Sequence, residues 1–305
     1  MNVSEVFLQQ LVNGLTIGMI YALIALGYTI VYGIVQLINF AHGEIFMVGA
    51  YLGLFVYSVL AQWGLISGGA VCCLPPIFLL SMFAAAGLGW TIERFAYRPL
   101  REAPRLAPLI TAIGVSFLLQ NAVMLIFGPA DKSYPAIVTV HKITRGTVTV
   151  TNLQVLITLI ALSLMAALHF FIKHTRTGRA MRALADDRVA AHLVGINVNQ
   201  VISIAFLIGS GLAGAAGVMF GMYYNTINFH DGYLAGLKAF TAAVLGGIGN
   251  IPGAMLGGVL IGVLEGLGAG YLSSQWKNVF AFFILILILL FRPSGLLGSR
   301  VVKKA

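Results

Sequence analysis

The stretch from Lys173 to Gln200, KHTRTGRAMRALADDRVAAHLVGINVNQ, is the one long polar interruption in an otherwise apolar chain. Its basic side chains are those of Lys173, Arg176, Arg179, Arg182 and Arg188. Apolar segments of membrane-spanning length lie on both sides of it, and loops rich in Lys and Arg stay on the cytoplasmic side of a membrane. This basic loop (residues 173–200) is therefore expected to be a docking surface in the cytoplasm.

Residues that begin or end helices divide the basic loop into short pieces. They are Thr177 and Gly178 before a first helix from Arg179 to Ala185, Asp186 or Asp187 before a second, Gly195 after Val194, and Asn197 before the next span. Ser, Thr, Asp and Asn side chains accept hydrogen bonds from the free N–H groups of a first helical turn, and Gly adopts the left-handed conformation that ends many helices. The pattern predicts two small helices.

The composition of the whole chain indicates a membrane protein. Of its 305 residues, 59% are hydrophobic and only 9% are charged, which is unlike a water-soluble domain. A net charge of +9 would suggest nucleic acid in a soluble protein, but here the basic residues cluster at the ends of apolar segments. The prediction is an all-α polytopic membrane protein, one domain over residues 1–305, in contact with a lipid bilayer and not with nucleic acid.

Eight apolar segments are long enough to cross a membrane. They are Gln10–Val35, Ile45–Gln62, Ala70–Ile92, Leu106–Gly128, Leu153–Ile172, Val201–Tyr224, Ala254–Leu272 and Trp276–Phe291. A ninth, Leu237–Asn250, is too short for a comfortable crossing and predicts a re-entrant or broken helix. Between the fourth and fifth segments, residues 137–140 (IVTV) and 147–151 (TVTVT) alternate at strand period, so we expect a small hairpin around Arg145 and Gly146.

Basic residues at the span ends predict the orientation. Three groups are expected to share the cytoplasm: Arg94, Arg98, Arg101 and Arg105; the five basic residues of the basic loop; and Arg292, Arg300, Lys303 and Lys304. The three groups share the cytoplasm only if Leu237–Asn250 and Ala254–Leu272 together carry the chain inward and back to the outside. The last span then returns the chain to the cytoplasm. The N-terminus then lies outside.

Small residues recur four apart on several segments, a spacing that lets membrane helices approach closely. The candidates for helix packing are Gly14 and Gly18, then Gly209, Ala213, Gly217 and Gly221, then Gly258, Gly262, Gly266 and Gly270. Such stripes are packing devices far more often than ligand sites.

Asn39, His42, Glu44 and Glu265 are the candidates for a role in the transport pathway or its gating. Asn39, His42 and Glu44 lie at the polar break between the first two spans, where Glu44 either complements the positive end of a helix dipole or gates the pathway. Glu265 lies inside a span, where it either makes an interhelical hydrogen bond or contacts substrate.

Catalytic and cofactor-binding patterns are missing from the sequence. G-x-x-x-x-G-K-[ST] is absent, and in LGGIGNIPG the third Gly of a dinucleotide fingerprint is replaced by Pro252. The six histidines are scattered, and Cys72 and Cys73 are adjacent in an apolar segment, which suits neither a metal site nor a disulfide framework. We expect no catalytic residue, no cofactor and no metal, so any ATP must be bound by other chains.

Several stretches resemble the LivH/BraD-type permeases of branched-chain amino acid importers. They are TRTGRAMRA (175–183) with AAHLVGI (190–196), YALIALGYTIVYG (21–33) with NFAHGEIFMVGAY (39–51), and KAFTAAVLGGIGNIPGAMLGG (238–258). Many permeases of ATP-binding-cassette importers carry Glu-Ala-Ala-x-x-x-Gly in the loop that contacts the ATPase. Ala190, Ala191 and Gly195 match that pattern, whereas Val189 replaces the Glu.

The resemblance implies a permease subunit that translocates leucine, isoleucine and valine across a bacterial inner membrane. It also implies a second related permease, two cytoplasmic ATPase subunits and a periplasmic amino acid-binding protein. Residues expected at the ATPase contact are Thr177, Gly178, Arg179, Arg182, Asp187, Ala190, Ala191 and Gly195. Two alternatives stay open: a self-sufficient secondary transporter or channel for a small solute, and an importer permease for amides or urea.

Overall fold

The computed structural model describes residues 3–37, 39–65, 70–104, 106–292 and 294–298. Its helices are α1 (Val3–Val35), α2 (Ala41–Gln62), α3 (Ala70–Ile92), α4 (Leu106–Phe127), α5 (Asn152–His174), α6 (Arg176–Asp186), α7 (Arg188–Leu193), α8 (Val198–Tyr224), α9 (Asp231–Gly246), α10 (Ile251–Tyr271) and α11 (Lys277–Phe291). The strands are β1 (Lys132–Ser133), β2 (Lys142–Arg145), β3 (Val148–Thr151) and β4 (Thr226–Ile227). The all-α class is confirmed.

Seven helices in the described part of the chain are long and apolar enough to cross a membrane: α1 to α5, α8 and α10. The expected eighth span, α11, has only 15 residues, fewer than the roughly 20 that a perpendicular crossing needs. α1 and α8 form the centre of the bundle, because 89% and 78% of their most apolar 18-residue stretches are buried. The corresponding buried share of α4 is 17%. The outer helices therefore present the surface for lipid or for partner chains.

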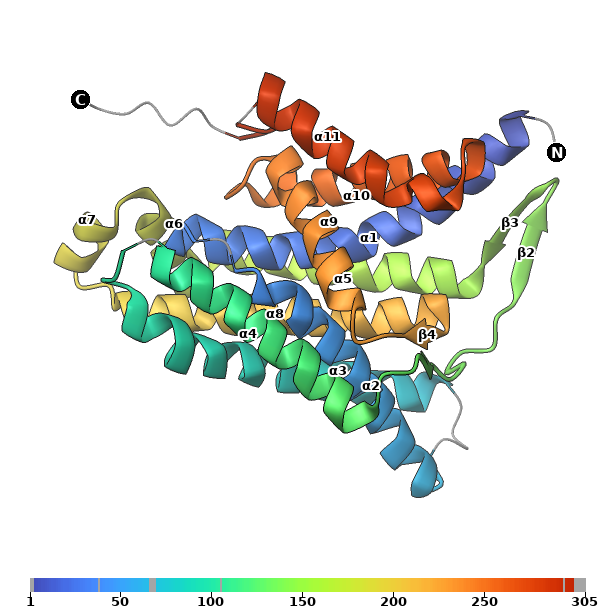
Figure 1. Ribbon diagram of the computed structural model, residues 1–305, viewed down its shortest axis with the longest axis horizontal. Coiled ribbons are helices and arrows are strands. Elements are labelled where there is room, and N and C mark those ends of the chain that lie inside the picture. Colours follow the sequence, from blue (N-terminus) through green and yellow to red (C-terminus); the bar gives the residue numbers. More distant parts are fainter. Residues whose placement is uncertain (1–2, 38, 66–69, 105, 293, 299–305) are drawn as a thin grey trace.

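The long helices run between two ends of the molecule, which Figure 1 shows at its left and right. One end holds α6 and α7 and is called the basic end; the other holds β2 and β3 and is called the hairpin end. The start of α1 is tied to the hairpin end, where Gln9 Oε1 accepts from Thr149 N at 2.8 Å and Gln9 Nε2 donates to Thr149 O at 3.0 Å.

The predicted hairpin is present, with its first strand displaced. β2 pairs with β3 so that Arg145 lies opposite Val148, and Gly146 makes the turn with a φ of +67°. The second strand agrees with the TVTVT pattern. Residues 137–140 are not a strand, because four residues of β2 already pair with all of β3.

α9 is displaced from the expected Leu237–Asn250, and in Figure 1 it runs obliquely through the middle of the bundle. The chain enters it from β4, which pairs with β1, and leaves it at Gly247. Gly247 and Gly249 have φ values of +103° and +92°, and Asn250 then caps α10 by accepting from Gly253 N at 3.0 Å. With 16 residues, α9 is shorter than a perpendicular crossing needs and is not among the seven candidate spans of the described residues, so the predicted parity stays a prediction. Arg105, Arg300, Lys303 and Lys304 lie outside the described residues.

α1 and α10 pack backbone to backbone through the two predicted glycine sets. A Cβ added at Gly14 would lie 2.7 Å from the carbonyl oxygen of Gly262, and one at Gly18 would lie 2.8 Å from the Cα of Val259. On the facing helix, Gly258 and Gly262 contact the backbones of Ala22 and Gly18, and Gly266 contacts that of Gly14. No side chain fits between these surfaces, so the glycines set the distance between the helices.

The glycine stripe of α8 meets several partners rather than one helix. Gly209 faces Gly27 of α1, and Gly217 faces Ala50 N of α2, from which an added Cβ would be 2.6 Å. The expectation that Gly221 packs on a helix is wrong. Gly221 faces the ring of Tyr134, because the loop after α4 folds this side chain into the bundle.

Candidate transport pathway and coupling surface

The first helix of the basic loop, α6, starts at Arg176, three residues earlier than the sequence predicts. Thr175, and not Thr177, is its cap: the Thr175 Oγ1 accepts from Gly178 N at 3.0 Å. Gly178 instead packs against the last carbonyl groups of α5, where an added Cβ would lie 2.5 Å from Phe171 O. Gly178 therefore lets α6 fold back closely onto α5, and this tertiary contact selects Thr175 as the cap.

The second helix, α7, has the caps that the sequence predicts. Asp187 accepts from Val189 N at 2.8 Å and from Ala190 N at 2.9 Å. Gly195 adopts a φ of +85°, and Asn197 caps α8 by accepting from Gln200 N at 3.1 Å. These local interactions fix two short helices at the basic end, where Figure 1 shows α6 and α7 projecting beyond the long helices.

α7 presents an apolar tip to its surroundings, which the sequence analysis missed. Val189, Leu193 and Val194 are 71%, 80% and 76% exposed, whereas Ala191 is buried and Ala190 is exposed. Large apolar side chains exposed together on a small helix mark a surface for another protein. The sequence does carry one signal of this apolar tip: Val189 replaces the glutamate that is usual at that position of the motif.

Arg179 and Arg182 lie on α6 with different surroundings. Arg179 is exposed, and its Nη1 lies 3.4 Å from the carbonyl oxygen of His174. Arg182 donates to the carbonyl oxygen of Ile172, near the end of α5. Arg182 thus also holds α6 against α5, whereas the exposed Arg179 makes only the longer bond to His174 O.

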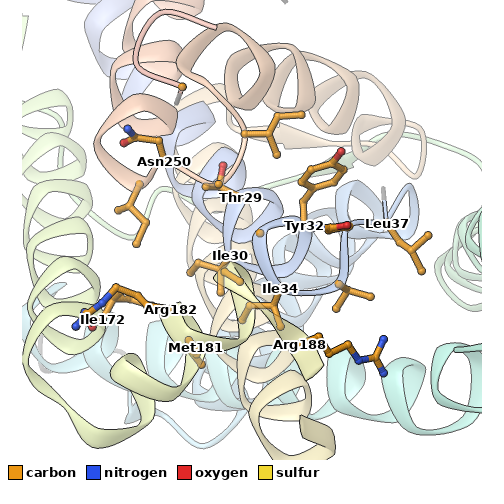
Figure 2. Close-up of a pocket in the computed structure, with 18 of the residues that line it drawn as sticks. Thr29, Ile30, Tyr32, Ile34, Leu37, Ile172, Met181, Arg182, Arg188 and Asn250 are labelled. Carbon is orange, nitrogen blue, oxygen red and sulfur yellow. Dashed lines mark hydrogen bonds between the residues drawn. The ribbon is translucent and has the colours of Figure 1, made fainter. Parts of the chain in front are cut away.

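A cavity of about 1130 Å³ opens beside the basic loop (Figure 2). The last turns of α1, the junction of α5 and α6, and the turn from α9 to α10 line it. Arg101, Lys173, Arg182 and Arg188 contribute four positive charges, and no Asp or Glu occurs among its described lining residues. The cavity therefore lies directly beside α6 and the surface predicted to contact an ATPase.

Arg101 connects this cavity to a buried ion pair. It bonds to the carboxylate of Glu93, which also accepts from Ser203 Oγ at 2.6 Å, and to the side chain of Asn199. Burial lowers the pKa of the Arg101 guanidinium, Glu93 opposes that shift, and the nearby charge of Arg188 lowers the pKa further. The pair joins the end of α3 to α8.

Three predicted pathway residues, Asn39, His42 and Glu44, are buried at the start of α2, and each keeps one polar atom unpaired among the described residues. Asn39 Oδ1 accepts from Tyr97 OH at 2.6 Å, and Glu44 Oε1 accepts from Ser116 Oγ at 3.2 Å. The Nδ2 of Asn39, the Nε2 of His42 and the Oε2 of Glu44 have no partner. Buried polar atoms without partners are costly, so this group is the best candidate for contacts made in another conformation.

α9 covers this polar group through glycines. A Cβ added at Gly43 would lie 2.8 Å from the Cα of Gly236, and Gly232 contacts the carboxylate of Glu44. Gly232 also meets the side chain of Met47, and Gly236 that of Tyr28. The glycines therefore let α9 close directly over the polar group.

Glu265 is not part of that group. Its Oε1 accepts from Lys238 Nζ at 3.0 Å and its Oε2 accepts from Tyr21 OH at 3.0 Å. The cluster joins α1, α9 and α10, which favours the interhelical role over substrate contact. Lys238 was missed by the sequence analysis, although a lysine inside an apolar helix is a signal for a buried partner.

Comparison with known proteins identifies the family. The family model described as branched-chain amino acid transport system, permease component, matches residues 10–289. The chain belongs to this family. The permease is 50% identical to the high-affinity branched-chain amino acid transport system permease protein BraD of Pseudomonas aeruginosa, over 98% of both chains. It is 46% identical to LivH, the protein of the same description from Escherichia coli K12, over 98% of this chain and 97% of LivH.

A second kind of relative is more distant. The permease is 26% identical to the E. coli permease protein LivM, over 92% of this chain and 68% of LivM. No solved structure matches the permease. Within the described residues, no three His, Cys, Asp or Glu side chains are grouped to hold a metal ion.

Proposed function

We propose that this permease is the membrane-spanning subunit of an ATP-driven importer, and that it carries leucine, isoleucine and valine across the bacterial inner membrane. The observation that carries the proposal is the basic loop, folded into two capped helices with an exposed apolar tip at one end of a multi-pass bundle. Such a surface suits a protein partner. The names of the relatives supply the cargo.

The partners follow from what this chain does not contain by itself. Its sequence has no nucleotide-binding pattern, and the resemblance to importer permeases implies two ATPase subunits, which dock on the basic loop. A second, related permease completes the pathway, and the existence of LivM as a more distant relative supports that part. A periplasmic binding protein delivers the amino acid at the hairpin end, and the basic end lies in the cytoplasm.

The secondary transporter is less well supported. Ion-coupled carriers need intramembrane carboxylates that can bind and release a cation. Lys238 already neutralises Glu265, which leaves Glu44 as the remaining candidate of the sequence analysis. A carrier also has no use for the apolar tip of α7.

Purification from native membranes tests the proposal. With an affinity tag on this chain, a second permease and an ATPase should copurify, and the chain alone in vesicles should not concentrate leucine. If the chain alone accumulates leucine in response to an ion gradient, the importer proposal is wrong.

A further inference from the structure

The cavity at the basic end combines positive charge with apolar walls. Ile30 and Ile34 of α1 line it together with Ile172 and Met181, and Figure 2 shows Arg182 and Arg188 around the same space. It lies where α1 and α5 end and the polar loop begins. α1 and α5 are candidate membrane spans, so we expect their ends at the level of the lipid headgroups.

Three of its four cations have no counterion among the described residues. Arg101 is paired with Glu93, and Arg182 with a backbone carbonyl group. Lys173 and Arg188 make no ion pair in the described structure, and the charge of Arg188 acts on Arg101 across the cavity wall. Like charges held together without a carboxylate repel each other, and an anion between them would remove this repulsion.

The amino acid cargo does not complement this lining. A zwitterion carries an ammonium group, and no Asp or Glu lines the described part of the cavity to receive it. An anion that carries an apolar body satisfies both the charges and the apolar walls. Basic pockets between membrane helices on the cytoplasmic side are known to accept anionic lipid headgroups.

We propose that the cavity binds the phosphate-bearing headgroup of an anionic phospholipid, held by Lys173 and Arg188 with Arg101 behind them. A lipid there bridges α1, α5 and the first residue of α7, next to the surface on which an ATPase would dock. Anionic lipid thereby stabilises the position of α6 relative to the spans. The inference concerns binding to this chain and does not depend on the cargo.

Native mass spectrometry of the purified complex, titrated with phosphatidylglycerol, measures the binding. The Lys173→Gln/Arg188→Gln variant should bind phosphatidylglycerol roughly tenfold more weakly than the wild type, because two charges near the headgroup are lost. The control Lys142→Gln/Arg176→Gln removes the same charge from exposed residues that do not line the cavity and should bind like the wild type. Phosphatidylcholine should bind equally to all three.

Two further measurements separate the sources of the anion. If glycerol 3-phosphate binds in detergent as tightly as phosphatidylglycerol, the site takes a soluble phosphate and the lipid proposal is wrong. If the cavity variant loses ATPase subunits but keeps phosphatidylglycerol, the cations contact protein, which also overturns it. Equal lipid binding by the cavity variant and the control has the same consequence, and circular dichroism establishes that both are folded.

Discussion

The Nζ atom of Lys238 lies 3.0 Å from the Oε1 atom of Glu265, and these residues are only 7% and 2% exposed. Tyr21 OH donates to the other carboxylate oxygen and lies 3.3 Å from Lys238 Nζ. α1 thus meets the consecutive helices α9 and α10 at one buried charge pair. Because α9 is short, this pair is its main polar attachment to α1 and α10.

Removal of one partner of this pair should destabilise the protein strongly. Glu265→Ala leaves the buried Lys238 charge without compensation, which typically costs about 3–5 kcal/mol. Tyr21→Phe removes one hydrogen bond and should cost only about 1 kcal/mol. Thermal unfolding in detergent compares the two variants. The double variant Lys238→Met/Glu265→Leu should recover most of the loss, and a Glu265→Ala effect no larger than that of Tyr21→Phe would argue against a structural role.

Bulk at the contact between α1 and α10 should abolish transport. Gly262→Leu places a side chain against the backbones of Gly18 and Gly14, so the helices must separate. Gly114 on α4 is the matched control, because an added Cβ there meets nothing within 4 Å. Uptake by Gly114→Leu should stay near the wild-type rate at equal membrane levels. Normal uptake by Gly262→Leu would contradict the close packing.

Charge reversal on α6 should uncouple ATP hydrolysis from uptake. In the Arg179→Glu/Arg182→Glu variant the docking surface changes sign, while insertion into the membrane should persist. Arg179→Glu alone is the sharper test, since Arg182 also bonds to α5 and its loss perturbs the fold. ATPase activity and uptake are measured on the same vesicles. Unchanged coupling in both variants would remove the basic loop as the contact.

Opposite ends of the bundle should differ in access to an impermeant thiol reagent. With Cys72 and Cys73 replaced, a cysteine introduced by Ser133→Cys should react from outside, and one introduced by Ala190→Cys should react only after the membrane is opened. Both positions are exposed, so burial does not confound the comparison. The reverse labelling pattern would invert the orientation.

Local features could be predicted from the sequence where a contact between residues close in sequence determines the structure. Asp187 caps α7 and Gly195 takes the left-handed conformation because each depends only on its immediate neighbours. The hairpin turn at Gly146 and the glycines of α1 and α10 follow from spacing alone. The family resemblance was likewise contained in a few short stretches.

Features that depend on distant segments were not predictable. Thr175 and Thr177 are equally good caps by type, and the packing of Gly178 on α5 decides between them. Lys238 and Glu265 are 27 residues apart and on different helices, so no local pattern connects them. The same holds for Tyr134, which enters the bundle from a loop to cover Gly221.

The central claim is that the complete complex imports branched-chain amino acids at the expense of ATP. The most direct measurement is uptake of labelled leucine into vesicles that contain the complex, with ATP on the ATPase side and the binding protein on the other. Isoleucine and valine should each compete with leucine, charged amino acids should not, and uptake should stop without ATP. Transport of urea or a sugar with no uptake of leucine would contradict the assigned cargo, and leucine uptake without ATP would contradict the ATP-driven mechanism.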